Sequence, residues 1–106
     1  MKRIVPRIAA EQDVDDAVDY YAIEAGEDVG YRFVEAVREA YRAIAENPGA
    51  SSPRYQHDLA VADLRSRRLR GFPFLVFYIE RADHIDVWRV LHAKRDIPAT
   101  LTEADA

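Results

Sequence analysis

The sequence has no cysteine and only four glycines, and both shortages exclude types of site. Without cysteine, the chain can form neither a disulfide bond nor a thiolate metal site. The glycines are isolated from one another, so no glycine-rich phosphate loop is present. The histidines are also few, and the spacing of His57, His84 and His92 is not that of metal ligands. We therefore predict neither a metal site nor a cofactor.

Long apolar runs are missing as well. No run approaches the roughly 18 residues that a membrane-spanning helix requires, and the basic start of the chain has no apolar stretch of a secretory signal behind it. These features predict a cytoplasmic protein without a membrane partner. The length of 106 residues leaves no room for a second core, so we predict a single domain over residues 1–106.

The charges that are present are unevenly distributed, although the net charge is only −4. Residues 9–50 contain eleven acidic residues and three arginines, a net charge of −8. Residues 51–97 contain nine arginines or lysines and six acidic residues, a net charge of +3. The sequence therefore predicts a molecule with an acidic helical half and a basic half made of strands.

The first half of the chain has the pattern of one strand and two helices. Residues 2–8 alternate in polarity, as an edge strand that ends near Pro6 would. Residues 10–25 carry apolar side chains at spacings of three and four, which predicts an amphipathic helix that ends at Gly26. A second such helix follows directly and stops at the Asn-Pro-Gly tripeptide around Pro48. Because the connection is so short, the two helices must form an antiparallel hairpin.

The second half has the pattern of three strands, at residues 63–70, 74–79 and 85–91. The middle segment consists only of apolar and aromatic residues, which is typical of a strand buried on both faces. Strict alternation in the last segment would place Val87, Arg89 and Leu91 on one face of the sheet and Trp88 and Val90 on the other. Short turns between the segments predict a three-stranded antiparallel meander.

Together the elements predict an α+β fold with two layers, in which the helical hairpin covers one face of a mostly antiparallel sheet. The strand at residues 74–79 is apolar on both faces, yet the hairpin can cover only one of them. Either the C-terminal tail or a partner protein must cover the other face, and we favour the partner. Residues 98–106 form a tail whose order the sequence does not determine.

The chain resembles the RelE/ParE superfamily of type II toxin–antitoxin toxins, and ParE most of all. The resemblance covers about residues 2–98 and includes the order of strand, two helices and three strands. The segments that carry it are Tyr20-Tyr21, Phe33, Arg68-Leu69-Arg70, Phe72-Pro73-Phe74, Val76-Phe77-Tyr78, Ile85 and, above all, the segment from Arg89 to Asp96.

This resemblance implies a bacterial toxin that a ParD-like antitoxin wraps and neutralises in a hetero-oligomer. ParE members inhibit DNA gyrase by trapping its cleaved DNA complex, whereas RelE members cleave messenger RNA on the ribosome. RelE-like members carry a tyrosine or histidine near the C-terminus; no tyrosine follows Tyr78 here, and His92 ends a strand. We therefore favour a gyrase inhibitor without an active site over the two alternatives, a RelE-like endonuclease and a non-toxic member that binds an antitoxin.

Three sets of candidate site residues follow from the basic strands and the resemblance. The target-binding set is Arg89, His92, Lys94 and Arg95. A nuclease would add Arg70 to the same four residues, with His92 as acid or base and the cations on phosphate. The antitoxin-binding set is Arg65, Arg67, Phe74, Val76, Tyr78 and Trp88.

Each candidate also has a purely structural interpretation. His92 could be a hydrogen-bonded residue at a strand end. Arg95 could form an ion pair with the adjacent Asp96 and anchor the tail. The arginines of residues 65–70 could be a solvated edge that discourages strand pairing.

Overall fold

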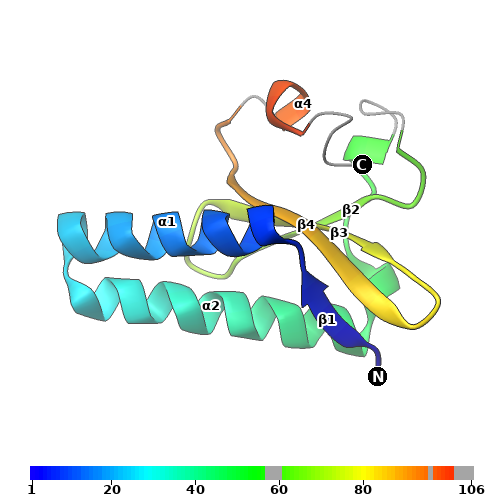
Figure 1. Cartoon of the computed structure of the whole chain (residues 1–106), viewed down its shortest axis with the longest axis horizontal. Helices are drawn as coiled ribbons and strands as arrows, with labels where there is room; N and C mark the ends of the chain where they lie inside the picture. Colours follow the sequence, from blue (N-terminus) through cyan, green and yellow to red (C-terminus); the bar gives the residue numbers. More distant parts are fainter. Residues whose placement is uncertain (57–60, 96, 102–106) are drawn as a thin grey trace.

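The structure of the chain is a computed structural model that describes residues 1–56, 61–95 and 97–101. Figure 1 shows a helical hairpin on one side of a sheet and a short C-terminal helix on the other. The predicted α+β fold is confirmed. Within the described residues, no helix is both long and apolar enough to cross a membrane. In chain order the elements are β1 (Arg3–Pro6), α1 (Ile8–Ala25), α2 (Glu27–Glu46), the 3-10 helix η1 (Pro48–Ala50), β2 (Arg65–Arg68), β3 (Phe74–Glu80), β4 (His84–His92) and α4 (Ile97–Thr100).

The four strands form one sheet in the order β1-β4-β3-β2. The β2–β3 and β3–β4 pairs are antiparallel, whereas β1 lies parallel to β4. The sheet is therefore mostly antiparallel, as predicted. Its parallel pair arises because the helical hairpin returns the chain to the sheet before the meander begins. The two edges are β1 and the arginine-rich β2.

The helical hairpin is tighter than a usual connection, because Gly26 alone separates α1 from α2. Gly26 has a φ of 101°, a conformation that other residues rarely adopt. A second glycine, Gly30, lies where the helices touch: a Cβ atom there would be 3.3 Å from the Cβ of Ala22 and from the carbonyl oxygen of Val18. Gly26 thus permits the turn, and Gly30 permits the close approach of the two helices.

The main core lies between the hairpin and the sheet. Phe33 and Ile44 of α2 are fully buried there, as are Val76 and Tyr78 of β3. At the end near the helix turn, four aromatic rings pack with centroids 5.0 to 6.2 Å apart; they belong to Tyr21, Phe33, Phe72 and Phe74. This aromatic cluster fixes the β2–β3 turn and the start of β3 against the hairpin.

A β-bulge in β4 makes part of the predicted alternation wrong. Phe77 lies opposite Arg89, whereas Tyr78 lies opposite Val87, so Trp88 is the extra residue on its strand. After the bulge each side chain points to the face opposite to the one that strict alternation requires. Val90 therefore joins Val87 in the main core, and Leu91 joins Trp88 on the other face.

The second face of the sheet is covered by the chain itself, so the prediction that a partner covers it is wrong. Ile97 and Leu101 are 2% and 4% exposed, and they pack with Tyr55 and Leu64 against the sheet. They cover a row of strand residues, namely Phe77, Ile79, Trp88 and Leu91, of which none is more than 5% exposed. The tail expected from residue 98 is thus an ordered helical turn up to Leu101, and residues 102–106 lie outside the described part.

Candidate functional site

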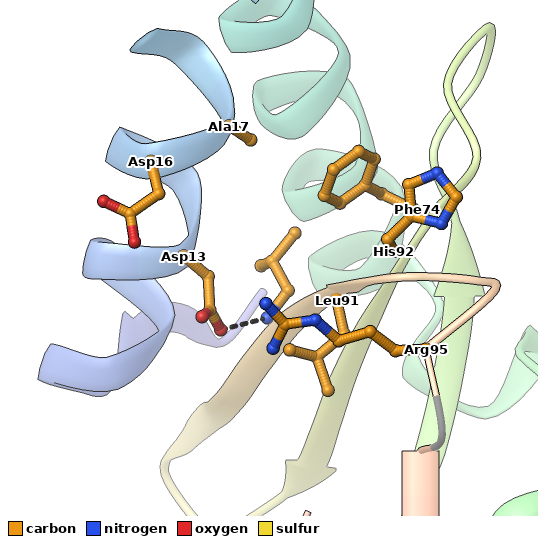
Figure 2. Close-up of a pocket in the computed structure, with 8 residues that line it drawn as sticks. Asp13, Asp16, Ala17, Phe74, Leu91, His92 and Arg95 are labelled. Carbon is orange, nitrogen blue, oxygen red and sulfur yellow. Dashed lines mark hydrogen bonds between the residues drawn. The ribbon is translucent and has the colours of Figure 1, made fainter. Parts of the chain in front are cut away.

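A groove lies where the end of β4 meets α1, and His92 is at its centre. One pocket of ≈ 180 Å³ has Asp13 and Asp16 of α1 on one wall and Arg95 on the other (Figure 2). A second pocket of ≈ 320 Å³ lies between His92 and the tyrosines of α1. The two pockets share three lining residues, so we treat them as one groove and call it the His92 groove. Its side chains come from Asp13, Asp16, Ala17, Tyr20, Tyr21, Phe74, Val90, Leu91, His92 and Arg95.

Arg89 belongs to the predicted target-binding set, but the structure uses it to join the sheet to α1. Its Nε and Nη2 donate to the two carboxylate oxygens of Asp13 at 2.7 and 2.8 Å. The backbone N–H of Val90 donates to the same carboxylate at 3.0 Å. The side chains of Arg89 and Asp13 are only 17% and 12% exposed. The pair thus supports the position of α1 and leaves little of Arg89 for a partner.

His92 lines the groove from the last position of β4. Its ring packs edge-on against Phe74, with centroids 5.2 Å apart. The backbone N–H of Lys94 donates to Nδ1 at 3.1 Å, which closes the turn after the strand. Because Nδ1 accepts this bond, the neutral ring carries its proton on Nε2. The interpretation of His92 as a hydrogen-bonded residue at a strand end is therefore correct for its Nδ1 atom.

Lys94 and Arg95 are the exposed cations of the site, on the turn that follows β4. Figure 2 shows the Arg95 side chain reaching back toward α1 and the carboxylate of Asp13. The predicted ion pair with Asp96 concerns a residue outside the described part of the chain. Of the four predicted target-binding residues, the groove brings His92 and Arg95 together, with Lys94 beside them.

The predicted antitoxin-binding set needs correction. Val76 and Tyr78 are fully buried, and Trp88 is 2% exposed, so a partner cannot contact these side chains. They are buried because the hairpin covers one face of the sheet and residues 97–101 cover the other. Tyr78 has a structural role: its hydroxyl donates to the carbonyl oxygen of Pro48 at 2.6 Å, and burial raises its pKa.

The remaining members of that set lie nearer the surface. Arg65 donates through Nη1 to the carbonyl oxygen of Ser51 at 2.8 Å and so holds the loop before β2. Arg67 and Phe74 are partly exposed. Arg67 faces α2 from the edge strand, whereas Phe74 lines the His92 groove.

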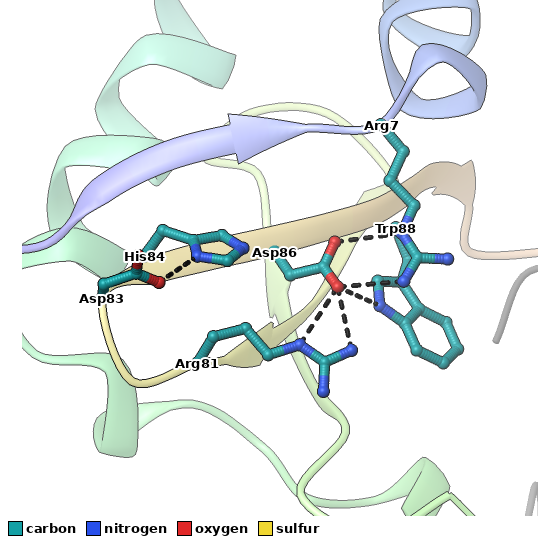
Figure 3. Close-up of polar contacts among 6 residues, drawn as sticks. All are labelled: Arg7, Arg81, Asp83, His84, Asp86 and Trp88. Carbon is teal, nitrogen blue, oxygen red and sulfur yellow. Dashed lines mark hydrogen bonds and ion pairs between the residues drawn. The ribbon is translucent and has the colours of Figure 1, made fainter.

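A polar cluster around Asp86 on β4 was not predicted from the sequence (Figure 3). Arg7 donates to both carboxylate oxygens at 3.0 and 2.9 Å, Arg81 donates at 3.2 and 3.0 Å, and the indole N–H of Trp88 donates at 3.1 Å. Burial alone raises the pKa of Asp86, but the hydrogen bonds from the two arginines outweigh it and lower the pKa. The available signal was a single acidic residue between the apolar strand residues Ile85 and Val87, since a buried charged group must find partners.

Exposed apolar side chains near the turn of the helical hairpin were also not predicted. Tyr20, Ile23 and Tyr31 are 60%, 80% and 69% exposed, and we call them the hairpin patch. A pocket of ≈ 230 Å³ adjoins Tyr31 and contains Val34 of α2. The signal in the sequence was large apolar residues that do not fit the apolar stripe of either helix. Such residues on a surface mark candidate interfaces.

The nuclease set does not converge on one place. Arg70 lies on the β2–β3 turn, forms a 3.4 Å ion pair with Glu39 of α2, and lines pockets other than the His92 groove. Arg89 is held by Asp13, and only His92, Lys94 and Arg95 remain near one another. The described residues also contain no group of three or more metal-ligating side chains.

Comparison with known proteins decides the family. A family model described as the ParE toxin of type II toxin-antitoxin system, parDE, matches residues 5–97. The chain therefore belongs to the ParE toxin family. The resemblance inferred from its strands and its Arg89–Asp96 segment is confirmed.

The fold of this chain is also similar to that of a solved structure. The chain is similar to one from the chromosomal ParDE toxin–antitoxin system of P. aeruginosa, with a TM-score of 0.73 and 21% sequence identity. The match covers 89% of this chain and 98% of that chain. At this identity the likeness concerns the fold alone. A search of curated proteins found no match.

Proposed function

We propose that this ParE-family chain is a toxin that arrests growth by binding DNA gyrase and trapping the cleaved DNA complex, without an active site of its own. The observation that carries the proposal is the dispersal of the candidate catalytic groups. Cleavage of RNA needs a base, an acid and cations around one phosphate. Here Arg89 is bound to Asp13, and Arg70 is paired with Glu39 of α2 outside the His92 groove.

The His92 groove has the features of a site for a protein partner. It combines an aromatic wall, formed by Tyr20, Tyr21 and Phe74, with the exposed cations Lys94 and Arg95 at its rim. Aromatic residues and arginine are enriched at protein interfaces. The groove and its rim are therefore the part of the chain that we assign to the target.

The test is expression without antitoxin, with gyrase–DNA cleavage complexes and messenger RNA measured in the same cells. We expect cleavage complexes to accumulate while messenger RNA stays intact. Arg95→Gln should reduce growth arrest, whereas Arg3→Gln should not, because Arg3 is an exposed arginine that pairs with His84 at the start of β4, and His92 ends that strand. His92→Ala should weaken a binder only mildly but should slow a nuclease by about 10² to 10⁴. Codon-linked cleavage of messenger RNA on ribosomes without cleavage complexes would overturn the proposal in favour of the RelE-like activity.

We further propose that a ParD-like antitoxin neutralises the chain by laying an apolar segment over the hairpin patch. This surface replaces the buried part of the predicted antitoxin set, because Ile23 and Tyr31 are among the most exposed large apolar side chains described. Covering a side chain of this size contributes about 1.5 to 3 kcal/mol. The antitoxin and the target would then contact different surfaces, the hairpin patch and the His92 groove, which share only Tyr20.

Ile23→Ala should therefore weaken binding of the protein encoded beside the toxin gene by about tenfold or more. Ile8→Ala is the matched control, because Ile8 is 86% exposed at the other end of α1, about 22 Å away. Isothermal titration of both variants measures the difference. Equal affinities would exclude the hairpin patch as the antitoxin site.

A further inference from the structure

The edge strand β2 and the turn that follows it carry three arginines that border a single pocket against α2. Arg67, Arg68 and Arg70 line this pocket, whose volume is ≈ 280 Å³, and we call them the arginine edge. Among the described residues that line this pocket, Glu39 is the only acidic one. Its ion pair with Arg70 is 3.4 Å long, and the Arg70 side chain remains 84% exposed. Ion pairs this exposed contribute little, because water screens them.

The other two arginines have no anionic partner among the described residues. No carboxylate described in the structure forms an ion pair with Arg67 or Arg68. This differs from Arg7 and Arg89, whose guanidinium groups are both bound to buried carboxylates. The arginine edge therefore presents positive charge that the described fold leaves uncompensated, although the whole chain carries a net charge of −4.

The surface next to the arginine edge continues along α2. A neighbouring pocket of ≈ 420 Å³ shares Arg70 and contains Arg32, together with Glu35 and Glu39. Arg38 forms a 2.9 Å ion pair with Glu35, in which both side chains are 68% exposed and screened by water. Among the described residues, the lining of the two pockets thus contains four arginines and two acids.

The chemistry of the pocket favours a phosphate backbone over a protein partner. Its apolar lining residues, Ala36, Ala40 and Leu69, are 8%, 4% and 2% exposed, so they offer no anchor for an apolar side chain. Protein interfaces need an apolar or aromatic centre, whereas nonspecific binding of nucleic acid is driven by release of counterions from phosphates.

Duplex DNA fits this surface better than a single strand. Proteins that bind single strands combine basic grooves with exposed aromatic rings on which bases stack. Of the two pockets, the ≈ 420 Å³ pocket is lined by one aromatic residue, Phe72, and its ring packs against Tyr21 and Phe33 with centroids 5.1 Å apart in each case. No other aromatic side chain lines these pockets among the described residues.

We propose that the arginine edge is a second binding surface, which contacts the phosphate backbone of duplex DNA without reading its sequence. It lies at the β2 edge, whereas the His92 groove lies between β4 and α1, so one molecule could contact a protein target and the DNA beside it. The proposal goes beyond the proposed function, because it concerns direct binding of DNA by this chain alone. If the arginines served only to prevent strand pairing at the sheet edge, the chain would not bind DNA through them.

The test uses the full chain and a fluorescent 30-base-pair duplex of mixed sequence, without gyrase or antitoxin. Anisotropy titrations between 50 and 200 mM salt give the slope of log affinity against log salt concentration. Each phosphate contact contributes about 0.9 to this slope. Replacing all three arginines by glutamine should therefore make the slope shallower by about 2.7, so that wild type loses about 40-fold more affinity over this salt range.

Matched variants distinguish DNA binding by the arginine edge from a general effect of the charge of the protein. Arg68→Gln should reduce the slope by about 1, whereas Arg3→Gln, on the opposite edge strand, should leave it unchanged. Because Arg67 is partly buried, the Arg68→Gln/Arg70→Gln double variant keeps the test valid if the triple variant unfolds, which circular dichroism detects.

Four results would overturn the proposal. The first is an equal slope for wild type and the arginine-edge variants, and the second is an equal effect of Arg3→Gln. The third is displacement of the duplex by polyglutamate as efficient as by unlabelled DNA at equal charge, which would indicate an acidic protein partner. The fourth is tighter and more salt-dependent binding of single-stranded RNA than of duplex DNA. Since no gyrase is present, none of these outcomes bears on the proposed toxin mechanism.

Discussion

Replacing Arg89 by alanine is predicted to destabilise the fold first and to reduce toxicity only as a consequence. Arg89 makes two charge-assisted hydrogen bonds to Asp13, and both side chains are less than one fifth exposed, at 17% and 12%. Removing one partner of such a pair leaves a largely buried charge, which costs about 3 kcal/mol. The backbone N–H of Val90 still binds Asp13 and limits the loss.

The assay is a double-mutant cycle by urea unfolding, supported by thermal melting. Arg89→Ala and Asp13→Ala should each lower the free energy of unfolding by about 3 kcal/mol, which lowers the Tm by about 12 °C for a domain of this size. The double variant should lose less than the sum of the two, with a coupling energy of about 2 kcal/mol. Arg95→Gln serves as the control, because this exposed side chain should affect growth arrest without changing the unfolding midpoint.

Two results would refute this reasoning. If Arg89→Ala changes the free energy of unfolding by less than about 0.5 kcal/mol, the pair with Asp13 does not support α1, since effects of that size are usual for ordinary surface positions. If the folded Arg89→Ala variant binds its target more weakly at full stability, Arg89 contacts the target directly.

Two further predictions concern the other face of β4. The pKa of Asp86 is lowered in the folded state, so its contribution to stability is full above about pH 4 and is lost as the pH falls through the folded pKa. The difference in unfolding free energy between wild type and Asp86→Asn should shrink in urea titrations from pH 7 to pH 2.5, and a constant difference would contradict the assignment. Ile97→Ala should cost about 2 to 4 kcal/mol and shift the fluorescence of Trp88, the single tryptophan, to longer wavelength; an unchanged spectrum would mean that residues 97–101 do not shield the sheet.

The sequence by itself determined the elements and the family, because local patterns encode both. The predicted end of the first helix at Gly26 and the stop of the second before Pro48 agree with the structure. So do the three strands, of which the middle one was predicted from residue 74 to 79 and is Phe74–Glu80. Periodicity, helix-ending residues and turn residues act over a few positions, so they can be interpreted without knowledge of the fold.

Only the tertiary structure decided what each face and each charge does, because these depend on contacts between distant residues. Arg89 became structural through Asp13, which lies 76 positions away in the sequence. The bulge at Trp88 moved Val90 and Leu91 to faces that strict alternation does not predict. Residues 97–101 covered the sheet face that had been assigned to a partner, and so left the His92 groove, the hairpin patch and the arginine edge as the surfaces open to other molecules. A one-dimensional pattern shows which side chains are apolar or charged, but their neighbours are set by the packing of the whole chain.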